Sequence, residues 1–132
     1  MSEAQLRKPL ATGASAPSTR KTRSRGFIHV TDQQRVDQIA ELNCRYNRRF
    51  PPGPGEAQQG VEGRALSQEK RFKHASVVAV GIQGGDVASA WLALETISLT
   101  AVTDGLGSGI AGVEKWYRTP FTRYRFAVVS GY

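Results

Sequence analysis

Apolar residues along this chain follow two different periods, and the shorter period predicts three strands. Residues 26–30 form a short β-branched and aromatic run, and residues 75–82 form a longer run that ends at a pair of glycines. Residues 121–129 alternate between apolar and polar side chains. Because one side of this last run is basic, we expect Arg123 and Arg125 to lie on the outward face of a sheet.

Two segments repeat their apolar residues at helical spacing. A capping-box pattern opens the first helix at Thr31, and two consecutive prolines end it. The second pattern predicts a helix over residues 87–97, with Trp91 and Leu94 buried in the core or in an assembly interface. Residues 98–103 are rich in β-branched side chains and fit a helix or a strand.

Two other segments lack any such pattern. Residues 1–25 contain few large apolar side chains, so they cannot bury enough surface to offset the entropy lost on ordering. Residues 51–68 are rich in Pro and Gly and predict a mobile loop. We therefore expect an α+β fold, a small single domain at residues 26–132 with about two helices and a few strands. A disordered, flexible basic arm at residues 1–25 would precede it.

Charge is concentrated in this arm. The chain has 18 Lys and Arg against 11 Asp and Glu, a formal net charge of +7. Residues 1–25 hold six of the cations and one of the acids, which leaves the rest of the chain nearly neutral. Such an uneven distribution is typical of proteins that meet polyanions. The candidate nucleic-acid contacts are Arg7, Lys8, Arg20, Lys21, Arg23, Arg25, Arg45, Arg48, Arg49, Arg71, Lys73, Arg123 and Arg125.

The glycines of residues 103–112 contain the spacing GxGxxG, which in dinucleotide-binding proteins cradles a pyrophosphate. That site needs a crossover helix after the glycines and an acid about twenty residues further on. Only about seven residues separate the glycines from Pro120, and no acid lies near the end of the chain. The cluster therefore predicts a loop or a close helix contact, and no phosphate site.

The remaining reactive side chains form no catalytic or metal-binding pattern. His29 and His74 lack the spacing of paired metal ligands, and Cys44 lies beside an apolar helix face, where a small packing role is expected. Glu95 is the one acid inside an apolar segment, for which an edge position or a partner arginine is expected. We predict no catalytic residue, no metal and no cofactor.

A cationic arm on a nearly neutral body is the design of viral coat proteins and nucleoprotein subunits. The leading hypothesis is therefore a nucleic-acid-binding structural or assembly subunit, a homo-oligomer rather than an enzyme. A DNA-binding accessory factor, a ribosome-associated protein, an adaptor using a proline-rich loop and a small enzyme with an unrecognised site stay open as alternatives. The sequence shows neither a signal peptide nor an apolar run of the ~20 residues that a membrane span needs, so we expect an intracellular location.

Overall fold

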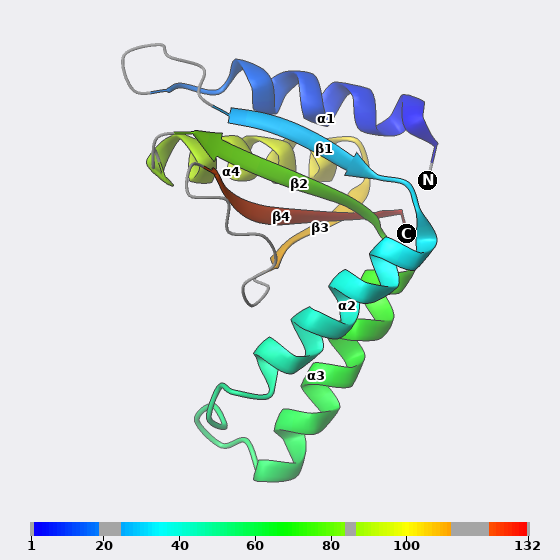
Figure 1. Ribbon diagram of the computed structural model, residues 1–132, viewed down its shortest axis with the longest axis vertical. Helices are drawn as coiled ribbons and strands as arrows, with labels where there is room; N and C mark the ends of the chain where they lie inside the picture. The colour runs from blue at the N-terminus through cyan, green and yellow to red at the C-terminus, as the bar shows by residue number, and fades with distance from the viewer. Residues whose placement is uncertain (1, 19–24, 84–86, 112–121, 132) are drawn as a thin grey trace.

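The computed structural model describes residues 2–18, 25–83, 87–111 and 122–131, which form helices and strands in an α+β arrangement (Figure 1). Their order along the chain is α1 (Glu3–Ser15), β1 (Arg25–Val30), α2 (Gln33–Asn47), α3 (Gln58–Lys73), β2 (Ser76–Gln83), α4 (Val87–Thr103), β3 (Leu106–Ala111) and β4 (Thr122–Gly131). The α+β class expected from the sequence is confirmed. The described residues contain four helices instead of about two.

The strands form one antiparallel sheet in the order β1-β2-β4-β3. β2 lies in the middle, where Val78 pairs with His29 on β1 and with Ala127 on β4. The three strands expected from the sequence are all present, and β3 adds an edge strand that was expected to be a loop. Sequence-distant segments therefore meet side by side in a single sheet.

α1 and α4 pack together against one face of the sheet. Their shared core consists of fully or almost fully buried side chains: Leu6, Val78, Val80, Ala90, Leu94, Ile97, Ala101 and Leu106. Burial of a large aliphatic side chain contributes roughly 1.5–3 kcal/mol, so this cluster supplies much of the driving force for folding. Because this cluster covers one face of the sheet, only the opposite face is left for other contacts.

α2 and α3 form an antiparallel helical hairpin that projects from one end of the sheet (Figure 1). A second apolar cluster joins its base to the sheet, and it contains Val36, Ile39, Ala40, Phe72, Val77 and Ala111. Asp32 begins α2, because its carboxylate accepts a hydrogen bond from the backbone N–H of Gln34. The sequence predicted Thr31 as the N-cap, which is one residue before the observed N-cap.

The disorder expected for residues 1–25 is wrong for Glu3–Ser15, which is helical. Ser2 caps this helix in a capping box with Gln5, and Leu6 is 1% exposed within the core shared with α4. A single large apolar side chain and the small buried residues Pro9 and Gly13 are enough for α1 to pack closely. The division of the remaining chain into one domain stays a prediction.

The mobile loop expected at residues 51–68 is also wrong over its second half, where α3 begins at Gln58. Val61, Ala65 and Phe72 are buried at helical spacing. These few apolar residues stand among two glycines and many charges, and they become a helix face only because α2 provides a partner.

α4 runs to Thr103, so residues 98–103 are helix. Leu94 is buried as expected, whereas Trp91 is 46% exposed and does not belong to the core. No helix among the described residues is long and apolar enough to span a bilayer.

Candidate functional site

The second face of the sheet is covered by the described helices only at one end, where the base of the α2–α3 hairpin packs on Val77 and Ala111. Val78 and Val80 face α1 and α4, so the alternate positions of β2 face the opposite way. On that second face Ile28 is paired with Ala79 and is 52% exposed. In Figure 1 this face is open, because α4 lies behind the sheet and the α2–α3 hairpin leaves from its end. We call it the open face and define it by Gly26, Ile28, Ala79, Gly81 and Gly109.

Both edge strands of the open face carry a glycine. A Cβ atom placed on Gly26 or on Gly109 would meet no other atom within 4 Å. Gly26 is on the edge strand β1 and is paired with Gly81, while Gly109 is on the opposite edge strand β3. Glycine in a strand lets another molecule approach the backbone closely. The backbone at these two edges of the open face is therefore open to close approach by another molecule.

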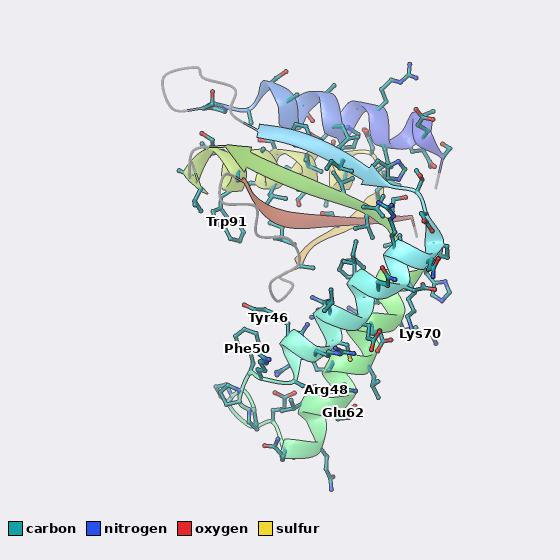
Figure 2. The ribbon with its side chains drawn as sticks, viewed as in Figure 1. Tyr46, Arg48, Phe50, Glu62, Lys70 and Trp91 are labelled. Atoms are coloured by element: carbon teal, nitrogen blue, oxygen red, sulfur yellow. The ribbon has the colours of Figure 1, made fainter. Side chains whose placement is uncertain are left out.

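The α2–α3 hairpin carries an aromatic pair. Tyr46 and Phe50 contact edge to face, with ring centroids 4.9 Å apart and planes at 82°. Phe50 is 47% exposed although it is a large apolar side chain. Figure 2 shows both rings on the same side of the molecule as Trp91. The hairpin therefore presents aromatic surface that is free to contact a ligand.

Ion pairs hold the two helices of the hairpin in register. Arg48 on α2 donates to both carboxylate oxygens of Glu62 on α3, at 2.9 Å from Nε and 2.7 Å from Nη2 (Figure 2). This hydrogen bond lowers the pKa of Glu62 and raises that of Arg48. Nearer the tip, Arg64 Nη1 donates to Glu56 Oε2 at 2.7 Å. Bidentate guanidinium–carboxylate contacts fix geometry as well as charge.

Cys44 has the packing role expected from the sequence. It is 1% exposed inside the hairpin, and burial followed by a hydrogen bond to Glu69 raises the pKa of its thiol. Glu69 is itself paired with Lys73 at 2.7 Å, which is the main cause of its lowered pKa. A buried thiol held in its neutral form is a poor nucleophile.

Several of the cations expected to bind phosphate are paired with carboxylates. Lys8 on α1 pairs with Asp104 just after α4. Arg45 pairs with Glu41 one helical turn earlier, at 2.6 Å. With the Arg48 and Lys73 contacts described above, four predicted phosphate contacts have acidic partners. Their charge was visible in the sequence, but most of the partners that neutralise it were not.

The other predicted cations are distributed over different elements. Arg7 lies exposed on α1, Arg49 follows α2, and Arg71 is exposed near the end of α3. Arg25 begins β1, and Arg20, Lys21 and Arg23 lie outside the described residues. Whether any of them binds a ligand stays a prediction.

The two β4 arginines have a described backbone only. Arg125 is paired with Val80 and Arg123 with Ile82 across the β2–β4 ladder. Their side chains lie outside the described part of the structure, so the outward position expected for Arg123 and Arg125 stays a prediction.

The glycine cluster serves a turn and a strand. Gly105 has a φ of +73°, a conformation that favours glycine, and it connects α4 to β3. The loop prediction is correct at Gly105 but wrong at Gly107 and Gly109, which pair with β4 in the sheet. A glycine strand in an antiparallel sheet has no resemblance to the strand–turn–helix of a dinucleotide site.

Neither the family models nor the curated proteins that were searched match this chain. Solved structures do match it over nearly its whole length. An iodotyrosine deiodinase bound to FMN and 3-iodo-L-tyrosine superposes with a TM-score of 0.79 at 18% identity, over 99% of this chain and 79% of that one. An FMN-bound nitroreductase from Desulfitobacterium hafniense gives 0.71 at 14% identity, over 99% and 78%. An FMN-bound nitroreductase from Bacteroides fragilis gives 0.69 at 14% identity, also over 99% and 78%.

The chain has a nitroreductase-like fold. These matches overturn the hypothesis of a nucleic-acid-binding structural or assembly subunit, because the structures that share the fold are FMN-binding flavoproteins. They also overturn the expectation that the chain is not an enzyme, together with the expected nucleic-acid partner.

Sequence reasoning missed the open face and the aromatic pair. Gly26 and Gly81 were treated only as a strand start and a strand residue, since nothing in the sequence shows that they stand opposite each other. Phe50 was assigned to no element. The one available signal was alternation of small residues in the glycine cluster, where Gly107, Gly109 and Ala111 share a face.

Proposed function

We propose that this chain is a flavoprotein that binds FMN and uses it in a redox reaction. The observation that carries the proposal is the superposition of nearly the whole chain on enzymes with FMN bound. When bound, FMN would supply transfer of electrons or hydride between two substrates. The chain's own residues would bind and orient the flavin and restrict access of water.

The open face fits the flavin ring. The ring system of FMN is planar and largely apolar, and such a ring requires a flat surface without protruding side chains. Gly26 and Gly109 add no side chain to the two edge strands, and Ile28 offers exposed apolar surface two residues from Gly26 on β1.

The phosphate of FMN needs a cation or backbone N–H donors. Arg71 is exposed in the last turn of α3, at the end of the hairpin that packs on the sheet. Its neighbour Phe72 packs in the same cluster as Val77, which lies on the open side of β2. We therefore assign the phosphate to Arg71 among the described cations.

Reconstitution with FMN tests the proposed function. The purified chain, mixed with FMN and passed through a desalting column, should retain flavin near one equivalent per chain. Its flavin fluorescence should be changed on binding, because the ring would leave water. Circular dichroism shows whether the chain is folded. If the folded chain retains no flavin and leaves the flavin fluorescence unchanged, the proposal is wrong.

The role of Arg71 has a matched control. Arg71→Gln should weaken FMN binding by about tenfold or more, the loss of roughly 1.4 kcal/mol. Arg35→Gln removes an exposed cation from α2, whose Nε lies 3.6 Å from Asp32 Oδ2. This variant should leave the affinity for FMN unchanged. Flavin fluorescence titration measures both. Equal affinities for the two variants would remove Arg71 from the site and leave the fold-based proposal standing.

An intracellular location stays a prediction. It rests on the sequence alone, and fractionation of cells that make the protein tests it. Recovery of the chain with the culture medium would contradict it.

A further inference from the structure

The α2–α3 hairpin is held together differently at its two ends. At its base, apolar side chains are buried between the helices and against the sheet: Val36, Ile39, Ala40 and Phe72. Farther out, the buried residues of the two helices are small or polar: Asn43, Cys44, Val61 and Ala65. Figure 1 shows this part of the hairpin extending away from the sheet. We call residues 43–65 the outer hairpin. Apolar burial stabilises it far less than the base.

Carboxylates make the charged contacts that hold the outer hairpin closed. Glu62 on α3 accepts both hydrogen bonds that the Arg48 guanidinium donates from α2, at 2.9 and 2.7 Å. Glu69, one turn beyond the outer hairpin, accepts a hydrogen bond from the buried Cys44 thiol of α2. It also pairs with Lys73 of its own helix at 2.7 Å. We call Glu62 and Glu69 the linking carboxylates.

The first turns of α3 have little stability of their own. Ala57 is the N-cap and makes no side-chain hydrogen bond, and Gly60 and Gly63 lie in the first two turns. The uncharged contact between the helices, from Asn47 Nδ2 to Gln68 Oε1, is long at 3.3 Å. These turns therefore depend on α2 to stay helical.

The groups around the linking carboxylates favour their charged form. They come from both helices: Arg48, Cys44, Asp37 and Glu41 on α2, and Lys73 on α3, with Glu56 and Arg64 paired to each other at the tip. Hydrogen bonds from Arg48 and Lys73 lower the pKa values of Glu62 and Glu69 below the ordinary 4.5. Burial raises the pKa of the Cys44 thiol above 9.0, so the thiol is neutral in acid and at neutral pH.

We propose that the outer hairpin opens as a unit in acid, while the base of the hairpin and the sheet stay folded. Protonation of Glu62 and Glu69 removes the charges with which Arg48 and Lys73 pair. A carboxyl group with a lowered pKa stabilises the closed form above its ordinary pKa, and that stabilisation is lost as the pH falls through the lowered value. Opening is therefore expected below pH 4.5. The apolar cluster at the base contains no titratable group, and the proposal does not depend on FMN.

Cys44 reports the opening, because it is the only cysteine of the chain and is 1% exposed. Its rate of reaction with dithiodipyridine, divided by the rate for the urea-denatured chain at the same pH, measures the open fraction. This ratio should rise by about tenfold as the pH falls from 4.5 to 3.

A second thiol shows whether the sheet stays folded. Val78→Cys, made together with Cys44→Ala, places the only thiol at a fully buried position of the core between the sheet, α1 and α4. This thiol should stay protected over the same pH range. A constant ratio for Cys44 would overturn the proposal, and so would an equal rise for the two thiols.

Neutral variants test the linking carboxylates at pH 7. Glu62→Gln and Glu69→Gln each resemble the protonated carboxyl group and should raise the ratio for Cys44 by about threefold, and the double variant by about tenfold. Glu41→Gln is the matched control, because Glu41 pairs with Arg45 of its own helix at 2.6 Å. It should leave the ratio unchanged. If Glu62→Gln and Glu69→Gln react no faster than Glu41→Gln, these carboxylates do not hold the hairpin closed and the proposal is wrong.

Discussion

Gly13 shows how a single residue decides the packing of α1. A Cβ atom at this position would lie 2.5 Å from Cγ1 and 2.9 Å from Cδ1 of Ile97. Ile97 is fully buried and cannot move aside without disturbing the core. The missing side chain of Gly13 therefore permits α1 to approach α4, and Gly13 belongs to the fold despite the low helix propensity of glycine.

Gly13→Ala should accordingly lower the free energy of unfolding. Overpacking costs about 1–3 kcal/mol, and the gain of about 1 kcal/mol in helix propensity offsets part of it. Gly63→Ala is the control, because a Cβ at Gly63 in α3 meets no atom within 4 Å. That variant should be stabilised by about 0.5–1 kcal/mol. Urea unfolding of both measures the difference, and stabilisation of both would disprove the close contact at Gly13.

Leu94 and Leu66 make a second comparison of single residues. Leu94 is fully buried in the core between α4 and the sheet, whereas Leu66 on α3 is 48% exposed. Leu94→Ala should lower the free energy of unfolding by about 2–5 kcal/mol. Leu66→Ala should lower it by less than about 1 kcal/mol, since half of its surface is already in water. Similar losses in the two urea melts would mean that α4 turns a different face to the sheet.

The α2–α3 hairpin depends on contacts between its own helices along most of its length. Arg48 and Glu62 provide the bidentate link between them, and the pKa of Glu62 lies below its ordinary value of 4.5 because of the hydrogen bond from Arg48. A carboxyl group with a lowered pKa contributes stability above its unfolded pKa. That contribution disappears as the pH falls through the folded pKa.

Glu62→Gln should therefore lower the unfolding midpoint of the chain at pH 7, and the difference from the unmodified chain should vanish well below pH 4.5. Arg48→Gln should cause a similar loss at pH 7, and the double variant should add little to either single one. Thermal melts at several pH values provide the measurement. A difference that stays constant down to pH 3 would show that the ion pair does not link the helices.

Periodicity predicted those elements whose apolar residues are dense. α2, β1, β2 and β4 could be placed, and most of α4 followed from the spacing of its apolar face. α1 and α3 were missed because each buries only three residues, and their burial depends on α4 and α2 as partners. Glycines within α3 resembled a loop, since glycine weakens a helix in isolation.

At the scale of the whole molecule, the net charge of +7 was a poor guide to function. It counts Arg48 and Lys73 as free cations, although both have carboxylate partners in the folded chain. The candidate site was equally hidden, because β1, β2 and β3 contribute glycines and other residues to the open face from distant parts of the chain. Long-range strand pairing creates that face, and no local motif reports it.

The last prediction tests the open face as the flavin site of the whole chain. Gly109→Val adds a β-branched side chain to β3, where a Cβ atom meets no other atom within 4 Å and such a side chain suits a strand. Thermal stability should be maintained or raised, while FMN binding should weaken by tenfold or more because the side chain occupies the space of the ring. Ile110→Val alters the neighbouring position on the opposite face of β3 and should leave FMN affinity unchanged. Flavin titration measures the FMN affinity of the two variants, and thermal melts measure their stability.

If Gly109→Val binds FMN as tightly as the unmodified chain, the flavin lies elsewhere on the fold. If Gly109→Val loses both thermal stability and FMN affinity, the valine has distorted β3. Gly109→Ala, which adds a smaller side chain, then decides: weaker FMN binding by a folded Gly109→Ala variant supports the site, and unchanged binding contradicts it.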